Sequence, residues 1–348
     1  MNILQAINQY WWIALSSFLL SVVFTKLAVK FFPKLGLMDR PLKYGLSRAP
    51  IPYYGGVAIF LAFIISVLLF VPIDPKVFGL IMGAFIIVFV GFFDDFFSLN
   101  PFIRLIFQMI AGLILAVVGI GVLSINLPII GSLDFSEPVI FGIKVFVWAF
   151  TVVWVMSIIN AMNLLDGVSG LNSGVSFIAG ITMFFLSINP SLHENLASQA
   201  PVAKIALILA MVALGFLLFD FPKAKILMGD TGSTFFGFII ATLAIFSGGK
   251  VATAFLVLGI VILDMFWVIL RRTLEKKPFW KGDLKHLHHR LLSAGFSERK
   301  VVLMYMTVCG FFGISAVFLV SSMQKLFMII AMAVLMIVLA IDLVFFKK

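Results

Sequence analysis

The stretch VFGLIMGAFIIVFVGFFDDFF, residues 77–97, joins a long apolar run to two adjacent acids. No charged side chain stands between Val77 and Phe93, and Asp94 and Asp95 follow directly. An apolar helix of about 20 residues spans the hydrocarbon of a bilayer. A charge near the bilayer centre costs about 2.5–3.5 kcal/mol on insertion scales, so acids in apolar sequence usually serve a function. The stretch therefore predicts a membrane helix that ends in a functional acidic pair.

Similar apolar runs recur along the whole chain. Of its 348 residues, 63% are hydrophobic and 11% are charged, whereas a soluble domain is about half apolar and a quarter charged. We predict an all-α, polytopic membrane bundle that forms one domain over residues 1–348. It has eleven spans, or ten if one of the short, glycine-bearing segments does not cross. The expected segments are Tyr10–Phe32, Gly55–Val71, Val77–Phe93, Phe102–Val122, Phe141–Ile159, Asn172–Ile188, Pro201–Phe219, Ser233–Ser247, Ala252–Leu270, Val301–Val320 and Leu326–Phe346.

The basic residues are distributed unevenly between the two sides of this topology. Of the 25 Lys and Arg, 20 fall on one side and 5 on the other. The positive-inside rule places the richer side in the cytoplasm, so we expect the N-terminus outside and the C-terminus inside. The net charge of +10 is then an orientation signal and an attraction to anionic lipid. It does not indicate nucleic-acid binding.

The loops on the two sides differ in content. The outer loops are short, and residues 124–138 carry Asn, Pro, Gly and Asp between apolar pairs, which predicts a small hairpin. Of the 15 Asp and Glu, 11 are cytoplasmic or stand at cytoplasmic ends of spans. We therefore expect the active site in the cytoplasmic loops at about residues 33–54, 94–101, 160–171, 220–232 and 271–300.

Asp94 and Asp95 close the third span. Consecutive residues point about 100° apart on a helix, so the two carboxylates cannot serve one ligand symmetrically. We expect one to face a metal or phosphate and the other to be held by a neighbouring base. A solvated helix end is the alternative, although acids at a helix C-terminus oppose the helix dipole.

Asn160, Asn163 and Asp166 follow the fifth span at intervals of three residues. If the helix continues, this spacing places the three polar groups roughly on one face. Amide and carboxylate oxygens suit Mg²⁺, which prefers hard oxygen ligands and keeps part of its water shell. The alternative is polar packing between helices, which is common in membrane bundles.

The segment MGDTGS, residues 228–233, precedes the eighth apolar run. Asp230 and Thr231 stand where a helix begins, and the free N–H groups of a helix start favour anions. The arrangement could hold a metal through Asp230 and a phosphate through the helix start. A simple helix N-cap is the competing interpretation.

Three of the four histidines occur in one cationic cluster, KHLHHRL, residues 285–291. Its members are His286, His288, His289 and Arg290. Without a cysteine or a nearby acid, the cluster is a weak candidate for zinc. His and Arg suit a diphosphate, which Arg binds bidentately. A basic loop that rests on lipid headgroups is the alternative.

These four signals lie on one side of one membrane. Carboxylates that face a cationic loop are what metal-assisted chemistry on a phosphate requires. A secondary transporter or lipid flippase is the main alternative of another class. Its ionisable groups would be expected near the bilayer midplane, where most of the middle spans here are continuous Ile, Leu, Val and Phe.

Together the motifs resemble those of the polyprenyl-phosphate N-acetylhexosamine-1-phosphate transferases. Within this superfamily the chain looks like the bacterial branch that begins enterobacterial common antigen, O-antigen and wall teichoic acid. The resemblance covers nearly the whole chain. Its motifs are Asp39-Arg40-Pro41 with Pro50, Pro52 and Gly55-Gly56; GFFDDFFSLN with Arg104 and Gln108; NAMNLLDGVSGL; FPKAKILMGDTGS; and HLHHRL.

The resemblance implies a reaction of UDP-N-acetylhexosamine, most commonly UDP-N-acetylglucosamine, with undecaprenyl phosphate. The products are undecaprenyl-diphospho-N-acetylhexosamine and UMP. It also implies a multi-pass protein of the bacterial inner membrane with its active site on the cytoplasmic face, in contact with membrane lipid. We allow for a homodimer.

The resemblance also assigns roles to individual residues. Asp94, Asp95 and Asp166 are implied as catalytic acids. Asp230 and Asn163 are implied as ligands of Mg²⁺, with Mn²⁺ as a substitute, and Asp264 as a further acid facing the cleft. The nucleotide and phosphate groups are expected to contact Lys43, Arg48, Asn160, Thr231, His286, His288, His289 and Arg290.

The chain departs from the family pattern at three positions. Ser47 stands where His is common, and Lys43 and Arg48 are expected to supply the charge instead. Arg104 stands where Lys is frequent, and Asp220 where Asn is expected before the proline. The phospho-N-acetylmuramoyl-pentapeptide transferase is the closest rival within the superfamily. Its loop tends to carry three consecutive histidines, unlike HLHHRL.

Overall fold

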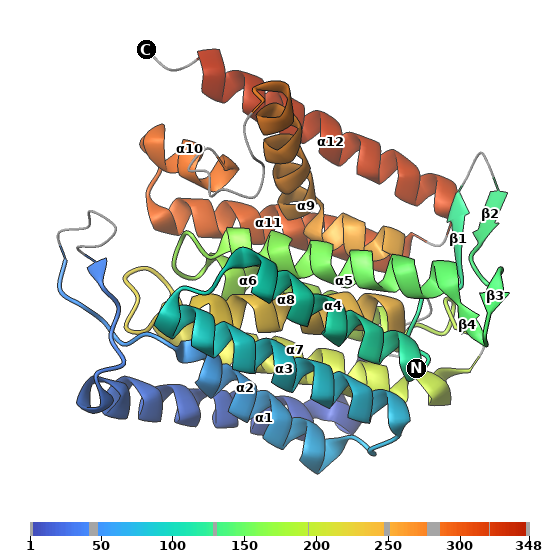
Figure 1. The fold of residues 1–348 in the computed structure, drawn as a ribbon, viewed down its shortest axis with the longest axis horizontal. Coiled ribbons are helices and arrows are strands. Elements are labelled where there is room, and N and C mark those ends of the chain that lie inside the picture. The colour runs from blue at the N-terminus through green and yellow to red at the C-terminus, as the bar shows by residue number, and fades with distance from the viewer. Residues whose placement is uncertain are drawn as a thin grey trace.

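The computed structural model describes residues 3–41, 48–127, 131–193, 195–246, 251–276, 286–319 and 321–345. Each of the eleven expected apolar segments overlaps one long helix, and together these helices form one bundle (Figure 1). They are α1 (Ile3–Phe31), α2 (Gly55–Phe70), α3 (Pro75–Phe97), α4 (Pro101–Val117), α5 (Val145–Leu165), α6 (Leu171–Ser187), α7 (Leu196–Asp220), α8 (Gly229–Phe246), α9 (Val251–Leu274), α11 (Glu298–Phe318) and α12 (Ser322–Phe345). A short 3-10 helix, η1 (Phe32–Leu35), extends α1, and the short helix α10 (Leu287–Ser293) precedes α11.

The composition of the helices confirms an all-α, multi-pass membrane fold. Among the described residues, eight helices are long and apolar enough to cross a bilayer. The other three apolar helices, α2, α4 and α6, have 16 or 17 residues, at the lower limit of about 17 residues for a span. The number of crossings, ten or eleven, stays a prediction.

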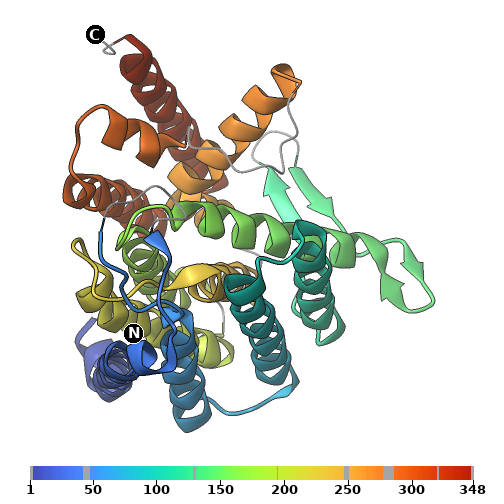
Figure 2. The same cartoon turned by 60° about the vertical axis from the view of Figure 1, so that its left-hand side comes forward.

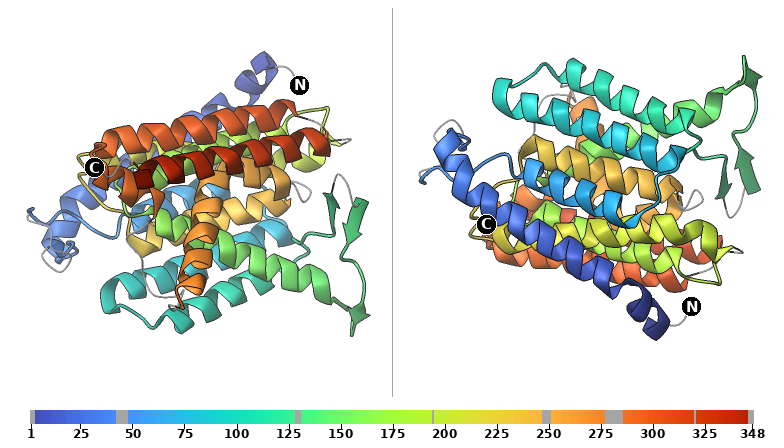
Figure 3. Two further views of the ribbon diagram at one scale, coloured as in Figure 1. Left: turned by 90° about the horizontal axis from the view of Figure 1, so that it is seen from above. Right: turned by 90° about the horizontal axis from the view of Figure 1, so that it is seen from below.

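Helix α8 lies at the centre of the bundle. It packs against α2, α3, α5, α6, α7 and α9, and 89% of its apolar stretch is buried, against 6% for α12. Helix α9 turns across the direction shared by most of the others (Figures 1 and 3), and α11 and α12 pack against it. The residues at the start of α8 are therefore surrounded by several helices, which is the position that the acidic site requires.

The loop between α4 and α5 forms two small antiparallel hairpins. Strands β1 (Ser124–Leu127) and β2 (Gly131–Asp134) pair as the sequence predicts. The second hairpin, β3 (Val139–Ile140) with β4 (Ile143–Lys144), was not expected. The fifth span was expected from Phe141, but α5 begins at Val145, because residues 139–144 pair as this hairpin before the helix starts. Figure 2 shows the hairpins projecting from the bundle.

Two backbones approach closely where α2 meets α8. A Cβ atom on Gly56 would lie 2.2 Å from the main-chain nitrogen of Gly232 and 2.6 Å from the carbonyl carbon of Thr231. Main-chain atoms cannot move aside as a flexible side chain can. Glycine at position 56 therefore allows α2 to reach the segment that carries Asp230.

We expect Gly56→Ala to lower the stability of the purified protein by about 1–3 kcal/mol, the usual cost of overpacking a well-packed core. Thermal unfolding in detergent, followed by size-exclusion chromatography, measures the change. Gly310→Ala is the matched control, because a Cβ atom there would have its nearest contact at 3.9 Å. Equal midpoints for both variants would contradict the close approach.

Candidate active site

The candidate active site lies at one end of the bundle, where the ends of α3 and α5 meet the start of α8. Main-chain hydrogen bonds hold the first loop against the segment before α8. The N–H groups of Gly55 and Gly56 donate to the carbonyls of Leu227 and Met228, each at 2.9 Å, and Leu227 donates to Pro52 at 2.9 Å. The first loop and the MGDTGS segment, far apart in sequence, therefore form one wall of the site.

Asp95 holds the first residues of α8. Its carboxylate accepts the N–H groups of Asp230 at 2.8 Å and Thr231 at 3.0 Å, and the Thr231 hydroxyl at 2.5 Å. The Tyr53 hydroxyl donates a fourth bond at 3.1 Å, and burial, followed by the charge of Asp95, raises the pKa of this phenol. Gly229 has a φ of +69°, and a Cβ atom there would lie 2.6 Å from the Asp95 carboxylate. The carboxylate of Asp95 thus caps a helix that belongs to another part of the chain.

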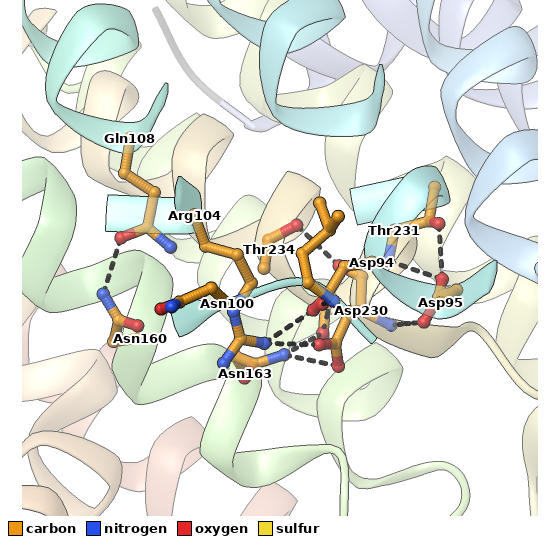
Figure 4. Close-up of polar contacts among 12 residues, drawn as sticks. Asp94, Asp95, Asn100, Arg104, Gln108, Asn160, Asn163, Asp230, Thr231 and Thr234 are labelled. Atoms are coloured by element: carbon orange, nitrogen blue, oxygen red, sulfur yellow. Dashed lines mark hydrogen bonds and ion pairs between the residues drawn. The ribbon is translucent and has the colours of Figure 1, made fainter. Parts of the chain in front are cut away.

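Asp94 and Asp230 share one guanidinium group (Figure 4). Nη1 of Arg104 donates to Asp94 at 2.7 Å and to Asp230 at 2.8 Å. Asp94 also accepts the N–H of Leu99 at 2.8 Å. The adjacent acids thus have different surroundings, as their helical geometry predicts: Asp94 is paired with a base, and Asp95 caps α8.

The two asparagines of α5 have different partners. Asn163 donates to Asp230 at 2.9 Å and to the Ser233 hydroxyl at 3.0 Å. Asn160 comes three residues earlier in α5 and donates to Gln108 of α4 at 2.7 Å (Figure 4). Asn160 therefore joins α4 to α5 as interhelical polar packing, and its expected contact with the nucleotide stays a prediction.

Asp166 follows the last residue of α5 and faces other acids. Within the described residues its carboxylate has no hydrogen-bond partner. Burial raises its pKa well above the ordinary value, and the carboxylates of Asp220, Asp230 and Asp95 raise it further. A cation that entered this region would relieve that repulsion.

Asp220 fixes the loop that follows Asp166. Its buried carboxylate accepts the N–H of Gly170 at 3.0 Å and the Ser173 hydroxyl at 2.7 Å. These bonds tie the end of α7 to the start of α6. Asp220, which stands where asparagine was expected, thus accepts hydrogen bonds from this loop. The side-chain oxygen of an asparagine could accept the same bonds.

The donors around Asp230 fit a magnesium ion. Three side chains here carry hard oxygen donors: the carboxylate of Asp230, the amide of Asn163 and the hydroxyl of Ser233. Mg²⁺ is commonly held by one or two carboxylates and completes its shell with water and phosphate oxygens. The described part of the chain contains no group of three or more His, Cys, Asp or Glu arranged for a metal ion. A magnesium ion here would thus draw on Asp230, Asn163 and non-protein oxygens.

The histidine cluster is anchored by Asp264 of α9. The Asp264 carboxylate lies 2.9 Å from Nδ1 of His286 and accepts the N–H of Leu287 at 2.9 Å. Both side chains are buried. Asp264 therefore holds the start of α10, and the acid expected to face the cleft is engaged with His286.

His288 and His289 bring the cluster to the α5–α6 loop. A Cβ atom on Gly167 would lie 2.7 Å from Nε2 of His288 and 3.1 Å from the ring of His289. Burial lowers the pKa of His288 to about 3, and the neighbouring histidines add to the effect. His288 is therefore neutral at physiological pH, and a charge for phosphate binding would come from its neighbour Arg290.

The first loop closes a cavity of about 450 Å³ over the acids. Its wall includes Arg40 as well as Asp94, Asp95, Arg104 and Asp230. Arg48, expected at the phosphates, is instead paired with Asp39 at 2.5 Å. Lys43, also expected there, lies outside the described residues.

Sequence reasoning missed three residues of this site. Arg104 and Arg40 occur in the quoted motifs, but nothing in their spacing shows that they face the acids. Tyr53 carries no motif signal. The turn at Asn100, whose side chain accepts the N–H of Phe102 at 3.0 Å, starts α4 directly after α3. The chain reverses at this turn, which brings Arg104 of α4 next to Asp94 of α3. The turn is the one local feature of the sequence that indicates this contact.

We expect Asp95→Ala to destabilise the protein by on the order of 3 kcal/mol, because it leaves several buried donors at the start of α8 without an acceptor. Asp94→Asn should change stability by less than about 1 kcal/mol, since the amide oxygen can still accept a hydrogen bond. Thermal midpoints of the two purified variants give the comparison. Similar losses for both would rule out the capping role of Asp95.

Comparisons with known proteins agree with this geometry. Residues 77–248, from α3 through α8, match the glycosyl transferase family 4. The chain is 29% identical to a probable undecaprenyl-phosphate N-acetylglucosaminyl 1-phosphate transferase of Bacillus subtilis, over 88% of this chain and 84% of that protein. It is 27% identical to a decaprenyl-phosphate N-acetylglucosaminephosphotransferase of Mycobacterium tuberculosis, over 82% of this chain and 77% of that protein.

A third relative, the undecaprenyl-phosphate alpha-N-acetylglucosaminyl 1-phosphate transferase of Escherichia coli O157:H7, is 28% identical over 82% of this chain and 77% of that protein. The matched segment contains both α3 acids, Arg104, Asn163 and Asp230. The matched family and the relatives agree, and the acids of the motifs converge in the structure: over residues 77–248 the chain is similar to glycosyl transferase family 4.

Proposed function

We propose that this protein transfers N-acetylglucosamine 1-phosphate from UDP-N-acetylglucosamine to a polyprenyl phosphate. The products are polyprenyl-diphospho-N-acetylglucosamine and UMP. The observation that carries the proposal is the convergence of Asp94, Asp230 and Asn163 at one end of a membrane bundle, where Arg104 bridges the two carboxylates. The carboxylate of Asp166 lies near enough to Asp230 and Asp95 to feel their charge. The relatives' names share a polyprenyl phosphate and N-acetylglucosamine phosphate. Those names differ in the prenyl chain, and we favour undecaprenyl phosphate, which two of the three carry.

The site suits an acceptor that resides in the membrane. The positive-inside distribution assigns the acidic end to the cytoplasm, where a nucleotide sugar is available. Exposed Phe96 and Phe97 lie beside the acids at the end of α3, so an acceptor phosphate could reach the site while its prenyl chain stays in lipid. We therefore place the reaction at the cytoplasmic face of the inner membrane.

We infer direct, in-line attack of an acceptor phosphate oxygen on the sugar-bearing phosphorus, with UMP as the leaving group. A phosphate monoester has a second pKa of about 6 and is already a fair nucleophile at neutral pH. Magnesium, when bound, would offset the charge of the diphosphate. Asp230 and Asn163 would hold it, and Arg104 and Arg40 would attract the phosphates into the cavity.

The contacts of the acidic pair disfavour a phospho-enzyme route. Asp95 already accepts four hydrogen bonds, and Asp94 is held by Leu99 and Arg104. A carboxylate engaged in this way is a weaker nucleophile than the free phosphate of the acceptor. The remaining role for Asp94 is to orient the acceptor or to take a residual proton from it.

Transfer of radiolabelled sugar tests the function directly. Purified protein receives UDP-N-acetylglucosamine and undecaprenyl phosphate, with magnesium or with EDTA. We expect lipid-linked label that requires magnesium and falls at least about 100-fold in Asp94→Asn and Asp230→Asn. Asp134→Asn, on the opposite end of the bundle, is the matched control and should retain activity.

Three outcomes separate the alternatives. Transfer from another UDP-hexosamine alone would change the donor and keep the reaction. Transfer that survives EDTA would remove the metal from the proposal. If no UDP-hexosamine is bound or consumed, the transferase assignment fails and a lipid flippase or transporter becomes the better account.

A further inference from the structure

Both carboxylate oxygens of Asp230 are occupied by hydrogen-bond donors. Oδ1 accepts Nδ2 of Asn163 at 2.9 Å, and Oδ2 accepts Nη1 of Arg104 at 2.8 Å (Figure 4). The residue best suited to hold magnesium is therefore already neutralised by a neighbouring guanidinium. A cation that binds Asp230 must first change these contacts.

Asn163 turns its amide nitrogen, not its oxygen, toward Asp230, so the two side chains cannot bind one cation together in this orientation. Its Nδ2 group donates to Asp230 and, at 3.0 Å, to the hydroxyl of Ser233. The orientation of an amide is assigned from such hydrogen bonds, and here both neighbours accept. Because only the amide oxygen can bind a metal, the amide group must turn over when a cation enters.

Arg104 can leave Asp230 without losing its other partner. The same guanidinium nitrogen lies 2.7 Å from Asp94, which is nearly fully buried and also held by the N–H of Leu99. The side chain of Arg104 is 32% exposed and that of Asp230 is 30% exposed. Both face the cavity of about 450 Å³. The guanidinium therefore has room to swing toward the cavity while Asp94 still neutralises it.

We propose that Arg104 is an internal counter-ion that the divalent metal displaces from Asp230. In the structure Arg104 bridges Asp94 and Asp230; a divalent metal held by Asp230 would require the Asn163 amide to turn and Arg104 to pivot on Asp94 into the cavity. This inference rests on the proposed function, which places the metal at Asp230. Arg104 acts as a positioning residue in the exchange, and its release puts a positive charge where the phosphates bind.

The exchange links metal binding to phosphate binding. Two positive charges compete for Asp230, so the guanidinium weakens metal binding as long as no phosphate draws it into the cavity. A phosphate in the cavity gives the guanidinium a new partner and removes that competition. Linkage requires the converse as well: metal binding strengthens the affinity for phosphate.

Binding of Mn²⁺ in the absence of substrate tests the proposal, with the free ion measured by electron paramagnetic resonance. We expect Arg104→Gln to bind Mn²⁺ about tenfold more tightly than the wild-type protein, within the usual range of coupling between sites. Arg104→Lys, which keeps the charge, should fall between them. Arg48→Gln removes a comparable ion pair with Asp39 and should leave the affinity unchanged.

A purely structural role for Arg104 predicts the opposite sign, because loss of a structural contact would loosen the site and weaken Mn²⁺ binding. Equal or weaker affinity in Arg104→Gln, with binding that is still lost in Asp230→Asn, overturns the counter-ion and keeps the metal site. Binding that is insensitive to Asp230→Asn overturns both. If Arg104→Gln does not fold, Arg104→Met, which also removes the charge, is compared with wild type, and an affinity no tighter than wild type contradicts the exchange.

Discussion

The first N–H groups of a helix lack acceptors within the helix, and those of α8 point at the end of α3. Asp95 supplies the missing acceptor through bonds to the N–H groups of Asp230 and Thr231. This contact fixes two distant segments relative to each other. It also determines where the side chain of Asp230 lies, because Asp230 is one of the two residues that Asp95 holds. Arg104 and Asn163 can donate to Asp230 only when Asp95 holds the start of α8 in this place.

The site concentrates negative charge at the end of an apolar bundle. Asp94, Asp95, Asp166 and Asp230 lie close enough for their charges to interact, and Arg104 is the cation that bridges two of them. Partly buried like charges repel each other more strongly than they would in water. Such a cluster favours the entry of cations, and a diphosphate substrate that arrives with a divalent ion satisfies both partners. Binding of the substrate with its divalent ion would therefore reduce the repulsion among these carboxylates.

The sequence was sufficient for features that depend on one segment at a time. Apolar runs predicted the eleven long helices, and the acids in apolar surroundings predicted which loops converge. Contacts between segments were beyond it. Asn160 and Asn163 share a face of α5, yet that face meets two different helices. Asn160 donates to Gln108 of α4, and Asn163 donates to Asp230 of α8. The hairpin β3–β4 was missed because its apolar residues continue the pattern of the following span.

Crystals of the protein grown with Mn²⁺ and UMP would test the central claim, that the contact between α3 and α8 builds one metal-dependent phosphate site. Anomalous scattering locates the manganese independently of the surrounding density. We expect one peak within coordination distance of Asp230 and the amide oxygen of Asn163, with Arg104 turned away from Asp230. A peak held by the histidine cluster alone, with Arg104 still bridging Asp94 and Asp230, would contradict it.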